Sequence, residues 1–371
     1  MPKMLITVTE DWAFLSHRVP TAMAARDAGY DVSVVARMRD HRDKIEELGF
    51  RTIPWNIKRE SQNPLSELSA LWDLIRIYRA EKPDASYHVA IKSIMYGSIA
   101  ARMAGVKRTF NLFSGMGVVF ISNSAKFQTV RAAVTPVLRW ALKPQTARLQ
   151  VQNGDDRNIL NGLGIATAER TDLIPGSGLD MENFPATGEM DAFAPKAVVV
   201  SRMLWDKGIG ELAKAARLLK DRGTALDIIL VGAPDPANPA SISEDQLKAW
   251  QDEGLMDWWG RRDDVAEIYK HAHIAVLPSY REGMPRALLE AASIGRPLVA
   301  FDTPGCRDLV RDGENGFLVP FQDVEALSDA LNKLAKDKTL RQTLGQAARQ
   351  DVENIYCAEA IRKQLTTIFS R

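Results

Sequence analysis

Cysteine and histidine are scarce in this sequence. It has 2 cysteines and 5 histidines among 371 residues, and Cys306 and Cys357 are not spaced as metal ligands. Two cysteines are too few for a disulfide framework, so we expect ordinary buried thiols in a reducing compartment. The formal net charge is +1, which gives no basis for binding nucleic acid.

Long hydrophobic runs are also lacking. No window approaches the roughly 20 apolar residues that a transmembrane helix needs. The apolar stretch at the amino terminus is too short for a secretory signal, and Glu10 and Asp11 follow it directly. We therefore expect a cytoplasmic protein.

What the sequence does contain is a regular alternation of short apolar strands and amphipathic helices. In the first half we expect strands at Met4–Val8, Asp31–Ala36, Phe50–Pro54, Asp84–Val89, Arg108–Phe113 and Thr146–Gln152. In the second half we expect them at Ala197–Ser201, Leu226–Val231, Met256–Trp259, Ala272–Leu277, Pro297–Phe301 and Gly316–Pro320. This rhythm predicts the α/β class with doubly wound parallel sheets, which bind ligands at the carboxyl ends of their strands.

The stretch from Ser279 to Glu290 joins a predicted strand to a predicted helix. Glu282 falls in the turn, and Glu290 lies one to two turns into the helix. The backbone N–H groups of 283–286 lie at the positive end of this helix, where they can bind an anion. Two carboxylates eight positions apart beside such a site suit a nucleotide-sugar, which is negative in its middle and polyhydroxylated at both ends.

A second candidate region follows the strand predicted at Ala197–Ser201. Arg202 and Lys207 lie five positions apart in a loop, and Gly208 starts the next helix. Two fixed cations can neutralise a diphosphate leaving group without a divalent metal. We therefore expect no metal site and no cofactor beyond the nucleotide-sugar itself.

These motifs together resemble the family 4 retaining glycosyltransferases, which have the GT-B fold of two Rossmann-like domains facing across a cleft. The resemblance covers nearly the whole chain. It rests on Ser201-Arg202, Lys207-Gly208, Glu282-Gly283 and Glu290, with an E-x7-E spacing between the two glutamates.

The resemblance implies a role for each motif residue. Arg202 and Lys207 are expected to hold the donor diphosphate, Glu282 to contact the transferred sugar, and Glu290 to bind the ribose hydroxyls. Residues assigned to the donor on the same grounds are Gly283, Met284 and Pro285.

The resemblance also sets the expected domain organisation. The segment 185–195 is rich in Pro, Gly and Ala and is the best linker candidate. We expect an acceptor-binding domain at 1–184, a nucleotide-sugar-binding domain at 196–353, and a last helix at 354–371 that crosses back to the first domain.

The loop after the first strand lacks the Gly-Gly pair that many family members carry there. Its aromatic residue followed by Ser-His-Arg-x-Pro is instead similar to a bacterial subgroup that extends sugars on polyprenyl diphosphates. This assigns His17 and Arg18 to the acceptor, with a solvated first helical turn as the alternative. Gly115 and Gly117 are assigned to the acceptor side too, because a similar glycine loop occurs in that subgroup and glycine permits close approach.

His88 ends the predicted strand Asp84–Val89. The family gives a histidine in this region a hydrogen bond to a sugar hydroxyl, so we predict His88 as a second catalytic residue beside Glu282. The alternative is a histidine that is satisfied within the fold and has only a structural role.

Charge is unevenly distributed along the chain. There is no Asp or Glu from Ala85 through Gly154, whereas Lys and Arg recur throughout this stretch. The segment 126–140 mixes cations with apolar and aromatic residues at helical spacing. Such a segment can lie on anionic lipid, where each cation contributes about 1 kcal/mol; the alternative is a packed helix with a solvated cationic face. Residues assigned to the membrane surface are Lys126, Phe127, Arg131, Arg139, Trp140 and Lys143.

The leading hypothesis is a retaining, metal-independent hexosyltransferase of polysaccharide or glycan biosynthesis at the inner face of the cell membrane. It would move a hexose or N-acetylhexosamine from a UDP-sugar to a polyprenyl-diphosphate-linked sugar. Expected partners are thus the UDP-sugar, the lipid-linked acceptor and an anionic membrane surface, but not nucleic acid. Alternatives are transfer to a soluble acceptor, a nucleotide-sugar epimerase and, more distantly, a non-catalytic sugar-binding protein.

Overall fold

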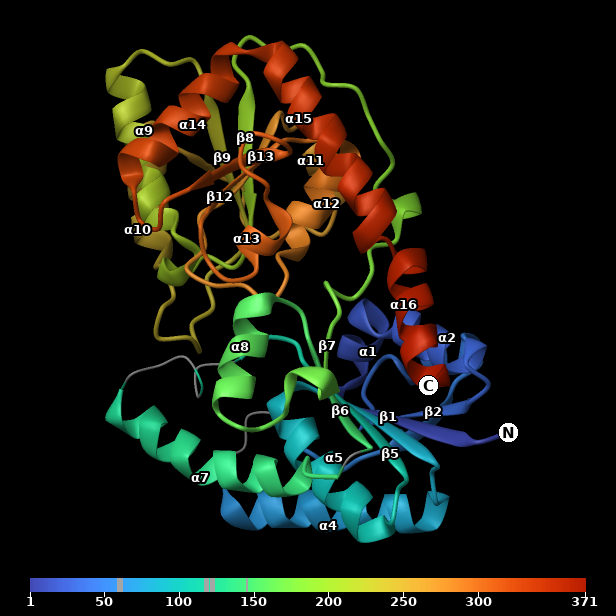
Figure 1. The fold of residues 1–371 in the computed structure, drawn as a ribbon. Helices are drawn as coiled ribbons and strands as arrows, with labels where there is room; N and C mark the ends of the chain where they lie inside the picture. Colours follow the sequence, from blue (N-terminus) through green and yellow to red (C-terminus); the bar gives the residue numbers. More distant parts are fainter. Residues whose placement is uncertain (59–62, 117–119, 121–123, 145) are drawn as a thin grey trace. The chain divides into compact units, whose positions relative to one another are not determined.

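The computed structural model covers residues 1–371 and describes all of them except 59–62, 117–119, 121–123 and 145 (Figure 1). The chain divides into two compact units. Unit 1 consists of Met1–Gly178 with Ala358–Arg371, and unit 2 of Leu179–Cys357. In this division the segment 185–195 lies within unit 2, and the last helix lies within unit 1.

Unit 1 is built on a parallel sheet of seven strands in the order β3-β2-β1-β4-β5-β6-β7. The strands are β1 (Lys3–Glu10), β2 (Asp31–Arg37), β3 (Arg51–Pro54), β4 (Ala85–Val89), β5 (Arg108–Phe113), β6 (Ala147–Val151) and β7 (Thr171–Leu173). In β1 the residues from Met4 through Val8 are all buried. A parallel strand covered on both faces needs apolar residues on both, which explains the continuous apolar runs in the sequence.

Helices cover both faces of this sheet (Figure 1). They are α1 (Asp11–His17), α2 (Val19–Asp27), α3 (Arg42–Glu47), α4 (Pro64–Glu81), α5 (Ala90–Ala104), α7 (Ala125–Ala141), α8 (Gly154–Gly162) and α16 (Ala358–Ser370). One buried cluster joins the sheet to α2 and α16, and another joins it to α4 and α5.

The last helix, α16, is an integral part of unit 1. It packs beside α2 (Figure 1). Its Phe369 ring lies edge-on to Tyr87 and Phe110, with centroids 5.8 and 4.9 Å apart. Arg108 of β5 also donates to the carbonyl of Phe369 at 2.9 Å. The carboxy-terminal residues therefore complete the core of the unit that the amino terminus begins.

The segment after β1 differs from the sequence prediction. The sequence predicted a loop after the first strand, but α1 begins at Asp11, directly after β1, and α2 follows at Val19. The buried carboxylate of Asp11 accepts hydrogen bonds from the backbone N–H of Trp12 at 2.8 Å and of Arg39 at 2.6 Å. Asp11 thereby ties the start of α1 to the loop after β2.

Unit 2 has a second parallel sheet, of six strands in the order β10-β9-β8-β11-β12-β13. Its strands are β8 (Lys196–Val200), β9 (Asp227–Val231), β10 (Asp257–Trp258), β11 (Ile274–Leu277), β12 (Leu298–Phe301) and β13 (Gly316–Val319). Its helices are α9 (Ile209–Asp221), α10 (Glu244–Asp252), α11 (Val265–Lys270), α12 (Arg286–Ile294), α13 (Cys306–Leu309), α14 (Val324–Lys336) and α15 (Lys338–Asp351).

Both sheets have a point at which the strand order reverses. In unit 1 this point lies between β1 and β4, and in unit 2 between β8 and β11. Ligands of doubly wound sheets bind outside the carboxyl ends of the strands at such a point. The predicted fold class is thus confirmed, and the loops after these four strands are where a site is expected. In the described part of the chain, no helix is long and apolar enough to cross a bilayer.

Candidate functional site

A pocket of about 420 Å³ opens at the carboxyl ends of β8 and β9 in unit 2. Arg202 lies in its wall, and its guanidinium pairs with Asp235 at 2.6 Å. Gly232 forms another part, with a φ of 144° and a backbone so close to Ser201 that a Cβ would lie 1.7 Å from the Ser201 carbonyl oxygen. Arg261 and Arg262 also line the pocket. A pocket that is lined by three arginines and by closely packed backbone suits a nucleotide, which is an anion.

Lys207 and Glu282 form an ion pair at the switch point of the same sheet. Lys207 ends a short helical turn after β8, Glu282 follows β11, and the Lys207 Nζ to Glu282 Oε1 distance is 2.6 Å. Both side chains are more than four-fifths buried. The two loops touch because Gly208, with a φ of 71°, allows an approach in which a Cβ would lie 1.9 Å from the carbonyl oxygen of Pro278.

A third loop, after β12, holds the backbone of Glu282 from the other side. The N–H of Glu282 donates to the carbonyl of Pro304 at 3.0 Å, and the Thr303 hydroxyl donates to the carbonyl of Ser279 at 2.9 Å. Gly305 lies so close that its Cβ would be 2.5 Å from the Glu282 carbonyl oxygen. Glu282 is therefore held by contacts with two neighbouring loops, the one after β8 and the one after β12.

Glu290 lies in α12, which begins at Arg286 without a side-chain cap. The Glu290 carboxylate accepts a hydrogen bond from Arg286 Nε at 2.8 Å and is 9% exposed. Burial raises the pKa of Glu290, and Arg286 opposes that rise. Gly283, Met284 and Pro285 form the turn directly before this helix, as the sequence predicted.

In unit 1, Arg18 has an unusual environment. It lies between α1 and α2 beside the switch point, and its side chain is 5% exposed. Within the described part of the chain, its guanidinium has no ion pair and no hydrogen bond. Burial lowers the pKa of Arg18, and the neighbouring Tyr87 phenol opposes that effect. An unpaired buried guanidinium is costly unless an acceptor from outside satisfies it.

Two residues that the sequence did not single out for binding accompany Arg18. The Tyr87 hydroxyl donates to Gln150 Oε1 at 2.8 Å. Gln150 Nε2 is buried, and none of the residues that the structure describes is its hydrogen-bond partner. No sequence signal marks Gln150, because its position follows from the pairing of β5 with β6. His17 is the last residue of α1, directly before Arg18.

The position of His88 does not suit the sugar contact that we predicted, and we correct that expectation. His88 is fully buried, with Nε2 3.0 Å from the Tyr78 hydroxyl and Nδ1 2.7 Å from Asn111 Oδ1. Burial lowers its pKa to about 4, and the Asn111 bond opposes that shift. Gly97 of α5 packs on its ring so closely that a Cβ there would lie 2.3 Å away. Both ring nitrogens of His88 therefore already have hydrogen-bond partners inside unit 1.

The structure describes one of the two glycines assigned to the acceptor. Gly115 has a φ of 112°, a conformation that favours glycine, and a Cβ there would meet open space. Gly117 lies outside the described residues.

Among the residues assigned to the membrane surface, Arg139, Trp140 and Lys143 are exposed, and Phe127 and Arg131 are half-buried. Trp140 is 47% exposed and stacks under the Arg102 guanidinium at 4.3 Å, and Lys143 is also exposed. Arg139 donates to the carbonyl of Leu163 at 2.7 Å, and Arg131 to that of Phe120 at 2.8 Å. Phe127 is half-buried. The side chain of Lys126 lies outside what the structure describes.

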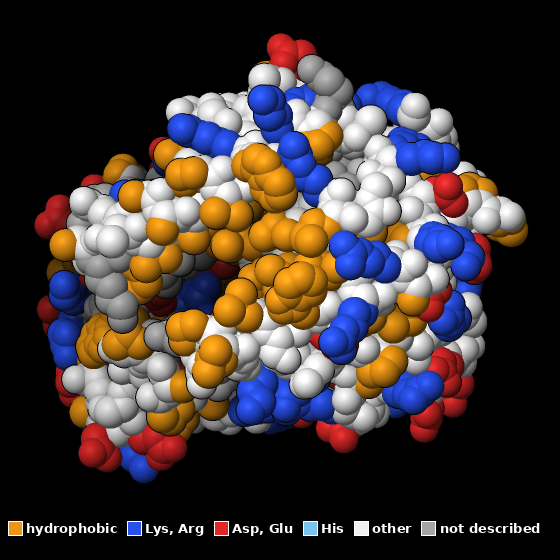
Figure 2. Space-filling view, turned by 90° about the horizontal axis from the view of Figure 1, so that it is seen from below, with side chains coloured by type: hydrophobic (Ala, Val, Ile, Leu, Met, Phe, Trp, Pro, Cys, Tyr) orange, Lys and Arg blue, Asp and Glu red, His pale blue; other side chains and the backbone are white. Residues whose placement is uncertain are grey.

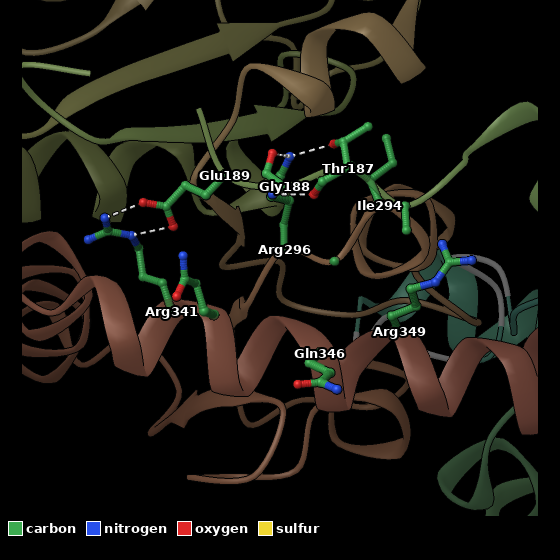
Figure 3. Close-up of a pocket in the computed structure, with 11 residues that line it drawn as sticks. Thr187, Gly188, Glu189, Ile294, Arg296, Arg341, Gln346 and Arg349 are labelled. Atoms are coloured by element: carbon green, nitrogen blue, oxygen red, sulfur yellow. Dashed lines mark hydrogen bonds and ion pairs between the residues drawn. The ribbon is translucent and has the colours of Figure 1, made fainter. Parts of the chain in front are cut away.

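Unit 2 has another pocket, of about 360 Å³, between α12, α15 and the segment 186–189 (Figure 3). The buried arginines of this pocket donate hydrogen bonds to the segment 186–189. Arg296 donates to Thr187 Oγ1 at 2.7 Å, and Arg341 Nε to Glu189 Oε2 at 3.0 Å (Figure 3). These contacts fasten the segment to unit 2, so the pocket is not a strong ligand candidate. Among the described residues, no group of three or more His, Cys, Asp or Glu side chains is placed to hold a metal.

Comparison with known families gives two matches that together cover most of the chain. The family described as "Glycosyl transferase 4-like" matches residues 3–153. The family described as "Glycosyl transferases group 1" matches residues 182–351.

Individual relatives and solved structures are similar over long stretches. A Campylobacter jejuni protein named N,N'-diacetylbacillosaminyl-diphospho-undecaprenol alpha-1,3-N-acetylgalactosaminyltransferase is 27% identical over 358 residues, which is 91% of this chain and 93% of the relative. An Escherichia coli protein named UDP-Gal:alpha-D-GlcNAc-diphosphoundecaprenol alpha-1,3-galactosyltransferase is 27% identical over 289 residues, covering 74% of this chain and 72% of the relative. The structure of sucrose-phosphate synthase from Thermosynechococcus elongatus matches with a TM-score of 0.80 and 21% identity, covering 100% of this chain and 98% of that one.

Proposed function

This chain belongs to the glycosyltransferases that combine a GT4-like and a group 1 domain in the GT-B fold, and from this premise we propose its substrates and mechanism. The donor is a UDP-sugar carrying a hexose or N-acetylhexosamine. The acceptor is a sugar linked to a polyprenyl diphosphate, and the anomeric configuration is retained. The Lys207–Glu282 pair at the switch point of unit 2 is the observation that carries this proposal.

Lys207 and Arg202 stabilise the departing diphosphate. Lys207 is fixed at 2.6 Å from Glu282, and Arg202 lies in the adjoining pocket. Fixed cations in a partly buried site stabilise developing negative charge more than cations in water do, because they need no reorganisation during the reaction. The uncapped start of α12 adds a positive helix end next to them. This set of charges supports a mechanism without a divalent metal.

Glu282 contacts the transferred sugar. Its backbone is held by the loop after β12, so its carboxylate has a fixed place beside Lys207. When the donor diphosphate draws Lys207 toward the phosphates, one carboxylate oxygen of Glu282 becomes available for the sugar hydroxyls and for the positive charge that develops on the ring. The departing phosphate oxygen acts as the base for the acceptor hydroxyl.

Glu290 binds the ribose. Its carboxylate is held by Arg286 one helical turn earlier and is nearly buried. A ribose diol can donate two hydrogen bonds to such a carboxylate, and the charged form is the better acceptor. Because burial raises the pKa of Glu290, the ionic partner Arg286 has the task of keeping it ionised.

Arg18 binds the diphosphate of the acceptor. An arginine that is 5% exposed and whose guanidinium has no partner in the described part of unit 1 suits an incoming phosphate. The relatives from C. jejuni and E. coli are both named for acceptors linked to diphospho-undecaprenol, which supports an acceptor of this class.

The test is release of UDP from purified enzyme with and without a lipid-linked sugar. We expect release from a UDP-sugar to depend on the lipid-linked acceptor and to continue in EDTA. Release that depends instead on a soluble sugar would favour the soluble-acceptor alternative. Isomerisation of the UDP-sugar with no acceptor would favour the epimerase.

A further inference from the structure

Helix α4 of unit 1 presents an apolar stripe on the side that faces away from its core. Leu65 is 77% exposed, Leu68 54% and Trp72 53%. These residues lie at i, i+3 and i+7, so they occupy one face of the helix. The opposite face carries Ala70, Leu74, Ile75 and Tyr78, which pack against α5 and the sheet. α4 is therefore apolar on two faces, although a surface helix normally has a polar outer face.

Two exposed arginines follow the apolar stripe along the outer face of α4. Arg76 and Arg79 are exposed one and two turns beyond Trp72. Within the described part of the chain, neither forms an ion pair. The outer face of α4 is thus apolar in its first half and cationic in its second.

The carboxylates of α4 are all engaged away from this face. Glu67 pairs with Lys92 at 2.9 Å, Asp73 accepts from the backbone N–H of Asn56 at 3.0 Å, and Glu81 accepts from Arg51 at 2.8 Å. Each side chain is turned toward a neighbouring element. Of the carboxylates that α4 carries, none is therefore left free beside the apolar stripe, whereas its arginines are.

The neighbouring helices α5 and α7 also carry exposed apolar side chains. α5 packs on α4, and α7 packs on α5. Met103 of α5 is 44% exposed, and Trp140 of α7 is 47% exposed. Figure 2 looks onto the side where α4 and α7 lie in Figure 1, and it shows hydrophobic side chains gathered in a broad band with Lys and Arg beside it. Contiguous exposed apolar area of this kind marks an interaction surface.

The positive charges of Arg76 and Arg79 indicate which partner binds the outer face of α4. A second copy of this chain would bring Arg76 and Arg79 against an equally cationic face, and like charges oppose such an association. An anionic lipid surface supplies the opposite charge together with an apolar layer below it. Leu and Trp side chains enter the boundary between headgroups and acyl chains, while arginines reach the phosphates.

We propose that the outer face of α4 is the element of unit 1 that inserts into an anionic bilayer, with Leu65, Leu68 and Trp72 in the acyl boundary and Arg76 and Arg79 at the lipid phosphates. The sequence assigned membrane contact to residues between 126 and 143. α4 instead has two apolar faces, of which the inner one is buried and the outer one is exposed in the described structure. The inference rests on the proposed function in one respect: an enzyme whose acceptor is linked to a lipid has to reach the membrane.

Vesicle cosedimentation tests the proposal. The variant Leu65→Ser/Leu68→Ser/Trp72→Ser is expected to lose about tenfold or more of its affinity for phosphatidylcholine vesicles that contain phosphatidylglycerol. Arg76→Gln/Arg79→Gln is expected to lose roughly fivefold per cation on these vesicles and to change little on phosphatidylcholine alone. A matched control is Met190→Ser/Phe193→Ser/Ile355→Ser, which removes three exposed apolar side chains from unit 2 and is expected to bind as the wild type does.

A depth probe gives an independent readout. Brominated acyl chains quench tryptophans that enter the bilayer, so part of the fluorescence of the wild type is expected to be quenched. Trp72→Phe should remove most of the quenched part, whereas Trp259→Phe should not. Unchanged quenching in Trp72→Phe, or unchanged vesicle affinity in the triple serine variant, would overturn the proposal. A concentration-dependent dimer of the wild type that the triple variant abolishes would overturn it in favour of a second copy.

Transfer to a water-soluble acceptor separates this proposal from the proposed function. A sugar linked to a short-chain alkyl diphosphate needs no bilayer, so the triple serine variant is expected to use it at the wild-type rate. If the wild type itself transfers no sugar to this acceptor or to a vesicle-bound one, the proposed function fails while the vesicle result stands by itself.

Discussion

Lys207 and Glu282 lie 75 positions apart in the sequence, and their side chains meet at 2.6 Å. Two loops from different strands converge there, and the ion pair joins the loop after β8 to the loop after β11. A substitution at either position therefore acts on both.

The first prediction concerns this pair. Lys207→Met is expected to lower kcat by about 10²- to 10³-fold, because it removes a preorganised cation from the leaving diphosphate. Glu282→Gln should lower kcat to a similar extent and leave binding of UDP nearly unchanged, since UDP lacks the transferred sugar. Steady-state kinetics and UDP titration by calorimetry measure the two effects. Undiminished kcat in either variant contradicts the site assignment.

The second prediction isolates the close approach at Gly208. Gly208→Ala and Gly223→Ala both place a Cβ on a residue with positive φ, of 71° and 66°. Only Gly208 faces a backbone oxygen, at 1.9 Å from the Cβ position, whereas Gly223 has nothing within 4 Å. We expect Gly223→Ala to lower the free energy of unfolding by about 1–2 kcal/mol, and Gly208→Ala by a further 1–3 kcal/mol or so. Urea unfolding gives both values, and equal losses would show that the loops can separate without cost.

A third prediction follows from the buried imidazole of His88. Its pKa is lowered to about 4, below the ordinary value near 6.5, so the folded state resists protonation. The contribution of His88 to stability is fully present above pH about 6.5 and is lost as the pH falls toward 4, with a total on the order of 3 kcal/mol. Unfolding by urea across this range should show a slope that His88→Gln flattens.

His271 provides the control for that series. It is exposed and pairs with Glu267 on the surface of α11. His271→Gln is expected to keep the slope of the wild type. A His88→Gln variant with the slope intact would mean that another group titrates.

The fourth prediction separates binding from structure at Arg18. Arg18→Met is expected to raise KM for the lipid-linked acceptor at least tenfold and to leave KM for the UDP-sugar unchanged. It should also raise the free energy of unfolding, by about 1–3 kcal/mol, because it removes a buried charge that no described residue compensates. Arg18→Lys should restore part of the acceptor affinity. A loss of stability in Arg18→Met would instead indicate a structural role.

Much of the fold can be read from the sequence, because buried parallel strands form continuous apolar runs that helices interrupt at regular intervals. The positions of Arg202 and Glu282 in loops after β8 and β11 follow from the same reading. The sequence could not show that Lys207 reaches Glu282, since this depends on how closely Gly208 approaches Pro278 in the folded chain.

The errors have equally physical causes. His88 was predicted to face a ligand because it ends a strand, but the partners that satisfy it, Tyr78 and Asn111, lie on other elements and leave no pattern in the sequence. The outer face of α4 was missed for the opposite reason. Leu65, Leu68 and Trp72 look like core positions until the structure shows that a different face of the helix is buried.

The position of α16 in unit 1 affects the order in which the two units fold during synthesis on the ribosome. Unit 2 is one continuous segment and can fold as soon as it has emerged, whereas the part of unit 1 that precedes it waits for α16. Until Phe369 arrives, the rings of Tyr87 and Phe110 lack their cover. The segment Met1–Gly178 is therefore synthesised before unit 2 but completed after it, and a nascent chain that stalls before α16 would leave that apolar surface open to chaperones.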